Sequence, residues 1–104
     1  MKPSIEKIKF IASLTEEDFI VIVVNNGYTY STHERMRDTW KLDKYFMNHI
    51  PDDGAIAKVI RKGEINRGAN GYAIETENQQ YIIGETGVRR ISLIEAILTL
   101  TKWN

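Results

Sequence analysis

The feature that most constrains the fold is an uninterrupted apolar run at residues 19–24. Phe19-Ile20-Val21-Ile22-Val23-Val24 is the longest such run in the 104-residue sequence. Branched side chains favour extended backbone, and a strand without polar alternation is covered on both of its faces. The run is far shorter than the roughly 20 apolar residues of a membrane-spanning helix. It therefore predicts a strand that is buried on both sides.

Residues 7–14, which precede this run, allow two interpretations. Four apolar residues alternate with polar ones, as on one face of a strand: Ile8, Phe10, Ala12 and Leu14. A helix that begins after Ser4 would instead align an apolar stripe of Ile5, Ile8 and Ile11 or Ala12. We prefer the strand and keep the helix as the alternative.

After the apolar run, turn and cap signals predict a hairpin and then a helix. Asn25-Asn26-Gly27 is typical of a tight turn, because Asn and Gly tolerate positive φ, and residues 28–31 would form the returning strand. Ser31-Thr32-His33-Glu34 fits a capping box, so a helix is expected from there to about His49. Pro51-Asp52-Asp53-Gly54 would end it.

The second half of the chain repeats this order. Residues 55–65 predict a long strand, and residues 66–71 a turn-rich loop. Residues 72–77 and 81–85 would form a hairpin across Asn78-Gln79-Gln80. Ser92-Leu93-Ile94-Glu95 is a second capping box, opening a helix that runs almost to Asn104.

These elements predict an α+β fold in one domain that comprises residues 1–104. The expected order is βββα-βββα, with a largely antiparallel sheet in two three-stranded meanders. Each meander is followed by a helix, and the helices pack on one face of the sheet.

Composition removes several classes of function. The chain has no cysteine, which excludes disulfides, thiolate catalysis and Cys-based zinc sites. The N-terminus lacks the apolar stretch of a signal peptide, so we expect a cytoplasmic protein. Fourteen basic residues balance 14 acidic ones. A dedicated nucleic-acid binder usually has a basic excess, so only a local patch would bind nucleic acid.

Known catalytic and ligand-binding motifs are not evident, and we expect no metal and no cofactor. On one continuous helix, His33 and His49 would lie about 24 Å apart and could not share an ion. Gly63 and Gly68 have the spacing of a phosphate loop, but Ala69 and Asn70 stand where Lys and Ser/Thr are needed. No Gly-x-Ser-x-Gly surrounds a serine.

A local group of cations is the candidate anion site. Basic residues crowd the strand at residues 55–65 and its loop, and two more precede the Ser92 cap: Arg61, Lys62, Arg67, Arg89 and Arg90, with Lys58 nearby. A helix N-terminus has free N–H groups, so Arg89 and Arg90 there could bind a phosphate. Alternatively, these cations pair with Glu75, Glu77 and Glu85 across the sheet, or are solvated.

Asp43 lies near the centre of the apolar arc of the first predicted helix. A buried carboxylate needs a partner and would be a functional candidate. The simpler interpretation is that the helix breaks after Lys41, so that Asp43 caps a second short helix.

The C-terminal helix is the best indication of a partner. Its apolar residues cover about twice the width that packing on one sheet requires. Either the helix is wedged between the sheet and the first helix, or its outer side meets another chain. The candidate partner-binding residues are Ile94, Leu98, Trp103, Trp40 and Arg37.

The preferred hypothesis is a small non-catalytic binding protein that acts by protein–protein interaction, as an inhibitor, a regulator or an immunity-type protein of a phage or mobile element. A homodimer is one form of this hypothesis. The first alternative is a nucleic-acid or phosphate-binding module that uses the Arg/Lys patch. The second is a small hydrolase with His33 or His49 as general base.

Overall fold

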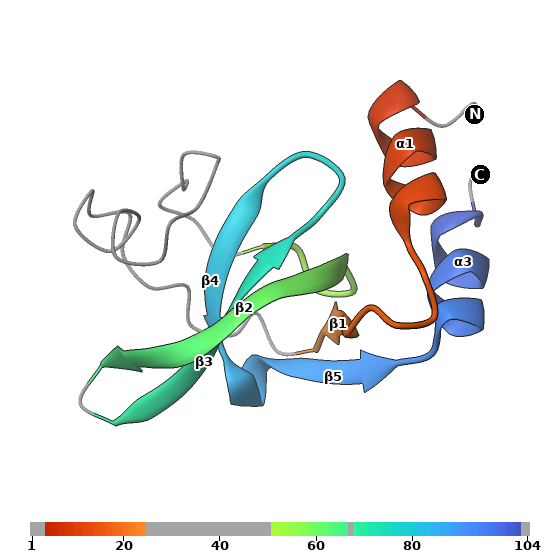
Figure 1. Ribbon diagram of the computed structural model, residues 1–104. Coiled ribbons are helices and arrows are strands. Elements are labelled where there is room, and N and C mark those ends of the chain that lie inside the picture. The colour runs from red at the N-terminus through yellow and green to blue at the C-terminus, as the bar shows by residue number, and fades with distance from the viewer. Residues whose placement is uncertain (1–3, 25–50, 67, 103–104) are drawn as a thin grey trace.

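The computed structural model of the chain describes residues 4–24, 51–66 and 68–102. These residues form an α+β fold with an antiparallel sheet, as predicted (Figure 1). In chain order the elements are α1 (Ile5–Ser13), β1 (Ile20–Val23), β2 (Ile56–Asn66), β3 (Ala69–Glu75), β4 (Gln80–Gly84), the 3-10 helix η1 (Glu85–Gly87), β5 (Val88–Ile91) and α3 (Leu93–Leu100).

Strand β1 lies inside the sheet, whose strand order is β4-β3-β2-β1-β5. It pairs with β2 on one side and β5 on the other, so that Val21 lies opposite Ala57 and Arg90. Ile20, Val21 and Val23 are at most 1% exposed. The prediction that this apolar run is a strand covered on both faces is confirmed.

The predicted pair of three-stranded meanders is wrong, because the described strands form one five-stranded sheet. Strands β2, β3 and β4 do form a meander, but the chain then passes through η1 and returns along the far edge of β1 as β5. The sequence pattern missed β5, since a four-residue strand with Arg89 and Arg90 at its centre shows no apolar alternation.

The predicted strand at residues 7–14 is also wrong, and the alternative helix is correct. Ser4 is the N-cap of α1, and its Oγ accepts a hydrogen bond of 3.1 Å from the backbone N–H of Lys7. Phe10 and Leu14 pack inward. Residues four apart share a face in a helix as well as in a strand, so the alternating pattern did not separate the two structures. The Ser4 cap favours the helix.

Helix α3 begins where the sequence predicts. Ser92 is the N-cap, and its Oγ accepts from the backbone N–H of Glu95 at 3.1 Å. The helix ends at Leu100, earlier than the predicted end near Asn104.

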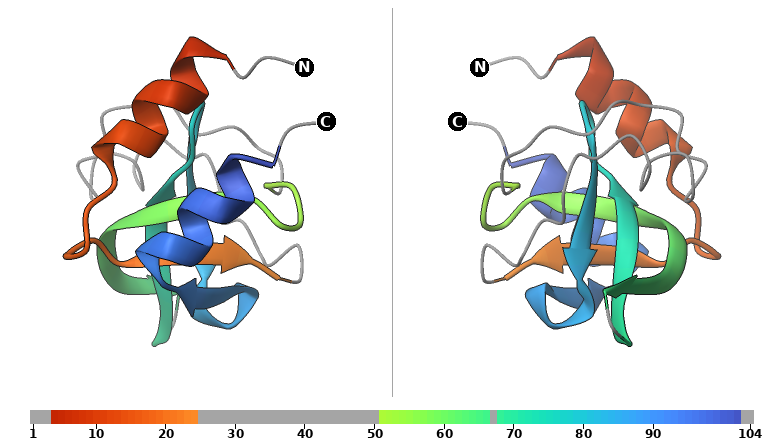
Figure 2. Two further views of the ribbon diagram at one scale, coloured as in Figure 1. Left: turned by 90° about the vertical axis from the view of Figure 1, so that its right-hand side faces the viewer. Right: turned by 90° about the vertical axis from the view of Figure 1, so that its left-hand side faces the viewer.

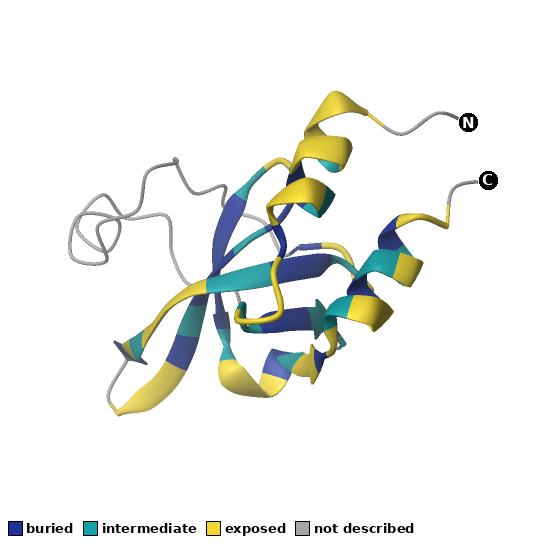
Figure 3. Ribbon diagram, turned by 45° about the vertical axis from the view of Figure 1, so that its right-hand side comes forward, coloured by how far each residue is buried: buried dark blue, intermediate teal, exposed yellow. Residues whose placement is uncertain are grey.

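Both described helices lie side by side on one face of the sheet, at the right of Figure 1 and towards the viewer in the left view of Figure 2. Inward residues of α1 and α3 form a core cluster with that face of β1, β2 and β5: Phe10, Leu14, Ile20, Ile56, Ile91, Ala96 and Leu100. Figure 3 shows the buried inner sides and exposed outer sides of these helices.

A second core cluster lies on the other face of β1. It joins β1 and the start of β2 to β3 and β4 through Val21, Val23, Ala57, Ile74, Tyr81 and Ile83. Residues of β1 can reach β4 in this way because β2, β3 and β4 bend across β1 (Figure 1). The sheet therefore encloses one core and supports the helices with its outer face.

The β2–β3 hairpin is tighter than the loop predicted at residues 66–71. The strands continue to Asn66 and restart at Ala69, with Gly68 at a φ of +87° in the turn. The backbone N–H of Gly68 donates to Oε1 of Glu64 at 3.0 Å. The predicted β3–β4 hairpin is present, and its turn is held by Thr76, whose hydroxyl donates to the carbonyl of Gln79.

Several sequence predictions fall outside the described residues. They are the turn at Asn25-Asn26-Gly27, the strand at residues 28–31, the helix from Ser31 to His49 and the alternative roles of Asp43.

Gly71 provides a test of the packing beside a β-bulge near the end of β2. The register shifts between Glu64 and Asn66, and the extra residue, Ile65, is buried against Gly71. A Cβ at Gly71 would lie 2.6 Å from Cγ2 of Ile65 and 3.0 Å from the carbonyl oxygen of Ile83. Gly71→Ala should lower the free energy of unfolding by about 1–3 kcal/mol in urea denaturation.

Gly84→Ala is the matched control, because a Cβ there meets nothing within 4 Å and its φ is −62°. We expect this variant to stay within about 0.5 kcal/mol of the original protein. Equal effects of the two substitutions would contradict the close contact at Gly71.

Candidate functional site

The outer sides of α1 and α3 carry large exposed aliphatic side chains. Ile5 and Ile8 of α1 are 67% and 53% exposed, and Ile94 and Leu98 of α3 are 71% and 59% exposed. We call these four residues the α1–α3 face. Because large exposed apolar patches mark interaction surfaces, these two neighbouring helices provide the candidate docking surface.

Each helix cap sets which residues point outward. In α3, the Ser92 cap starts the helix so that Ala96 and Leu100, four residues apart, face the core. Ile94 and Leu98 are also four apart and lie on a different side of the helix. Trp40, Arg37 and Trp103, the other predicted partner-binding residues, lie outside the described residues.

A groove of about 590 Å³ adjoins the α1–α3 face at Ile94. It lies between the α1–β1 connection and the start of α3, and its charged lining residues are Glu16, Asp18, Glu95 and Arg90. Three carboxylates against one guanidinium make the groove acidic.

Arg89 and Arg90 do not meet at the N-terminus of α3. They are consecutive strand residues and therefore point to opposite faces of β5. Arg89 forms an ion pair with Glu95 at 3.3 Å, in which both side chains are about half exposed, so it contributes at most about 1 kcal/mol. At this end of α3, the carboxylates of Glu16, Asp18 and Glu95 thus lie beside the two arginines.

Arg90 instead belongs to a cluster of cations and aromatic rings on the face of the sheet that points away from the helices. Its Cζ lies 4.5 Å from the ring centroid of Phe19, and Nζ of Lys62 lies 4.3 Å from the same centroid. The rings of Phe19 and Tyr72 are 5.5 Å apart and tilted by 56°, and Nζ of Lys62 lies 5.9 Å from Tyr72. We call these four residues the Phe19 cluster.

A β-bulge brings Lys62 into the cluster. Val59 pairs with Ile74 and Arg61 with Ala73, so Ile60 is an extra residue in β2. In a regular strand without the bulge, Lys62 would point to the opposite face from Val59, because it is three residues further along and side chains alternate. With it, Lys62 lies across from Tyr72 on the face that Val59 shares.

The two cations of the Phe19 cluster are not neutralised by the described part of the chain. Both side chains are exposed, and neither has an ion-pair partner there. A cation against an exposed aromatic face gains about 0.5–1 kcal/mol, which favours this packing but leaves the charge in place.

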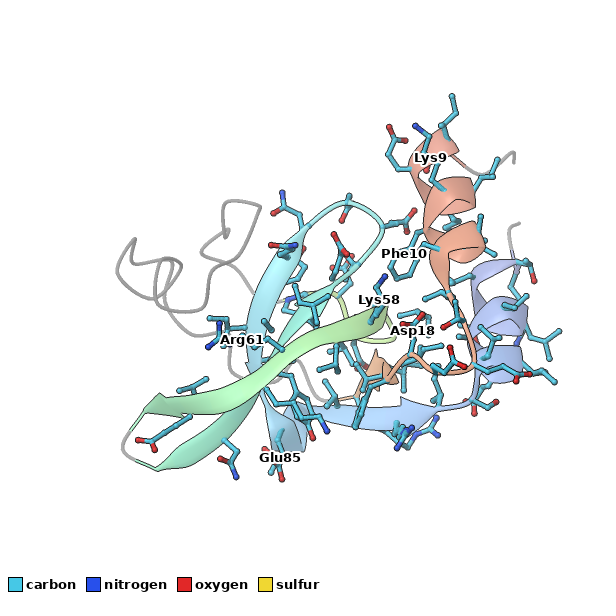
Figure 4. The ribbon with its side chains drawn as sticks, in the orientation of Figure 1. Lys9, Phe10, Asp18, Lys58, Arg61 and Glu85 are labelled. Carbon is cyan, nitrogen blue, oxygen red and sulfur yellow. The ribbon has the colours of Figure 1, made fainter. Side chains whose placement is uncertain are left out.

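The remaining predicted cations lie elsewhere. Figure 4 shows Arg61 and Lys58 at separate places along β2: Lys58 lies near its start, opposite Glu75 of β3, and Arg61 lies in its middle, opposite Ala73. Arg67 lies outside the described residues. Of the five residues of the predicted anion site, the structure thus brings together Lys62 and Arg90. Sequence reasoning missed the two aromatic residues, Phe19 and Tyr72, as possible members of that site.

A separate polar pocket of about 330 Å³ lies between the β3–β4 turn and residues 51–56. Asp52, Glu77, Asn78, Gln79 and Tyr81 provide its polar groups. Burial raises the pKa of Tyr81, and the negative charge of Asp52 raises this pKa further. Within the described ranges, no three His, Asp or Glu side chains are arranged to bind a metal ion.

Comparison with models of protein families, with curated proteins and with solved structures found no match to this chain. In the described part of the chain, neither helix is long and apolar enough to cross a membrane.

The raised pKa of Tyr81 predicts a loss of stability at high pH. The phenol ionises less readily in the folded protein, so its contribution to stability is complete below the unfolded pKa of about 10 and is lost as the pH rises through the folded value. The free energy of unfolding, measured at a series of pH values, should fall less above about pH 10 in Tyr81→Phe than in the original protein.

Asp52→Asn removes the second cause of the raised pKa and keeps the tyrosine. Above about pH 10, the free energy of unfolding of this variant should fall less than that of the original protein but more than that of Tyr81→Phe. Identical pH profiles of all three proteins would contradict the environment described for Tyr81.

Proposed function

We propose that this chain is a non-catalytic binding protein whose α1–α3 face docks a partner protein. The observation that carries the proposal is the exposure of Ile5, Ile8, Ile94 and Leu98 on two neighbouring helices. Burying such a side chain fully stabilises by about 1.5–3 kcal/mol. A partner that covers the face would therefore gain a contribution to binding from each of the four residues.

The acidic groove beside Ile94 supports a particular kind of partner. Glu16, Asp18 and Glu95 lie at the edge of the apolar surface, where interfaces place their polar rim. A partner that presents aliphatic side chains next to a lysine or arginine would match both the apolar face and the groove. Charge complementarity of this kind raises the association rate and selects among partners.

The two helices are well suited to present this surface. Each is capped by a serine at its N-terminus and anchored to the sheet by inward residues. These are Phe10 and the C-cap residue Leu14 for α1, and Ala96 and Leu100 for α3. Because both are packed on the same rigid face, the outward residues are held in place before a partner binds. Such preorganisation reduces the entropic cost of association.

The hydrolase hypothesis has no support from the described residues, since His33 and His49 both lie outside them. It stays a prediction of the sequence alone.

The proposal is tested by capturing partners from extracts of the source cells and then titrating the purified partner by calorimetry. Leu98→Glu should weaken binding at least tenfold, because it removes apolar burial worth about 1–2 kcal/mol, given that 59% of the side chain is exposed in the free protein, and it places a charge in the interface. Asp18→Asn should weaken binding less and reduce its dependence on salt. Leu98 is 59% exposed, so urea denaturation should show little loss of stability in Leu98→Glu.

Thr86→Glu is the control, since it adds the same charge at an exposed position in η1. It should bind as the original protein does. Equal binding by Leu98→Glu would refute the proposal. A homodimer that Leu98→Glu converts to monomers would overturn the assignment of this face to a different protein, because the face would then bind a second copy of the chain.

A further inference from the structure

We infer that the Phe19 cluster binds a single-stranded nucleic acid, with backbone phosphates at Lys62 and Arg90 and a base against Tyr72. This site uses none of the four residues of the α1–α3 face, and it shares only Arg90 with the groove beside that face. It rests on four residues that come from separate segments. They are Phe19 just before β1, Lys62 in β2, Tyr72 in β3 and Arg90 in β5.

In the described part of the chain, neither cation of the cluster forms an ion pair, although Arg90 also lines the acidic groove. Lys62 and Arg90 each lie within 4.5 Å of the centroid of the same ring, so their charges are at most about 9 Å apart and repel each other. The negative face of an aromatic ring offsets this repulsion in part. A bound anion would neutralise it fully, and the exposure of both side chains leaves them accessible to one.

The aromatic pair favours nucleic acid over other anions. Phe19 and Tyr72 are both partly exposed, and their rings lie next to the two cations. Single-stranded nucleic acids bind to surfaces of this composition, because cations follow the phosphate backbone while bases stack on aromatic rings. A free phosphate or a carboxylate would use the cations alone. In a duplex the bases are stacked on each other and would not reach the rings.

The charge balance of the chain sets the expected strength of binding. With 14 basic and 14 acidic residues, the protein as a whole gives no attraction to nucleic acid at long range. The site itself offers two phosphate contacts. Binding should therefore be modest in affinity and only moderately dependent on salt.

The experiment is fluorescence anisotropy with a labelled thymidine oligonucleotide of about 12 nucleotides, which fits the usual site size of such surfaces. Titrations between about 50 and 200 mM salt should give a slope of about −1.4 for the logarithm of the association constant against that of the salt concentration, as expected for two contacts to a single strand. A duplex of the same length should bind at least tenfold more weakly.

Two variants separate the roles of the cations and the rings. Lys62→Gln/Arg90→Gln should weaken binding at least tenfold and remove most of the salt dependence. Tyr72→Leu should weaken binding about tenfold and leave the salt slope unchanged, because stacking involves no counterion release.

Arg89→Gln/Lys102→Gln is the matched control, since it removes two exposed cations outside the cluster. It should change the affinity by no more than about twofold, and circular dichroism and urea denaturation should show that all variants are folded.

Four results would overturn the inference. They are the absence of oligonucleotide binding at about 50 mM salt, equal binding by the cluster variant and its control, equal affinity for duplex and single strand, and binding of inorganic phosphate without binding of the oligonucleotide. Ile5, Ile8, Ile94 and Leu98 are unchanged in every variant, so none of these results tests the apolar part of the proposed partner-binding surface.

Discussion

The burial of β1 on both of its faces is the constraint on which the rest of the described structure depends. Its four residues hydrogen-bond to β2 and β5 on either side, and their side chains divide between two cores. Ile20 contributes to the cluster beneath α1 and α3, and Val21 and Val23 to the cluster enclosed by β3 and β4. Because every residue of β1 is aliphatic, its own side chains do not select a register. The register of β1 comes from the neighbouring strands. On the β2 side, Ala57 is small enough to lie buried opposite Val21, and on the β5 side Arg90, also opposite Val21, can reach solvent.

The two surfaces considered for function both follow from this strand. On one face, the cluster around Ile20 anchors α1 and α3 and so fixes the outward direction of Ile94 and Leu98. On the other face, the ring of Phe19, just before β1, contacts Lys62 of β2 and Arg90 of β5. Strands β2 and β5 are the neighbours of β1 in the sheet. Arg90 also lines the acidic groove next to Ile94, so this side chain lies where the two surfaces approach each other.

Local signals predicted the elements that depend on local physics. The apolar run of β1, the long strand β2, the β3–β4 hairpin and the Ser92 cap were all readable from residue type and spacing. The choice between strand and helix at residues 7–14 was not, because Phe10 and Leu14 satisfy both periods and the Ser4 cap was given too little weight. Strand β5 was missed because pairing with β1, not its own sequence, makes Arg89 and Arg90 extended. The Phe19 cluster could not be predicted, since it requires the bulge at Ile60 and contacts between residues that are more than 40 positions apart in the sequence.

Native-state hydrogen exchange tests the central role of β1 most directly. If the strand holds both cores together, the amides of Ile20–Val23 that donate to β2 and β5 should exchange only through global unfolding. Their exchange free energies should then equal the unfolding free energy measured in denaturant. Exchange of these amides through a local opening, while β2 and β3 stay protected, would show that the sheet is stable without β1 and would contradict this account.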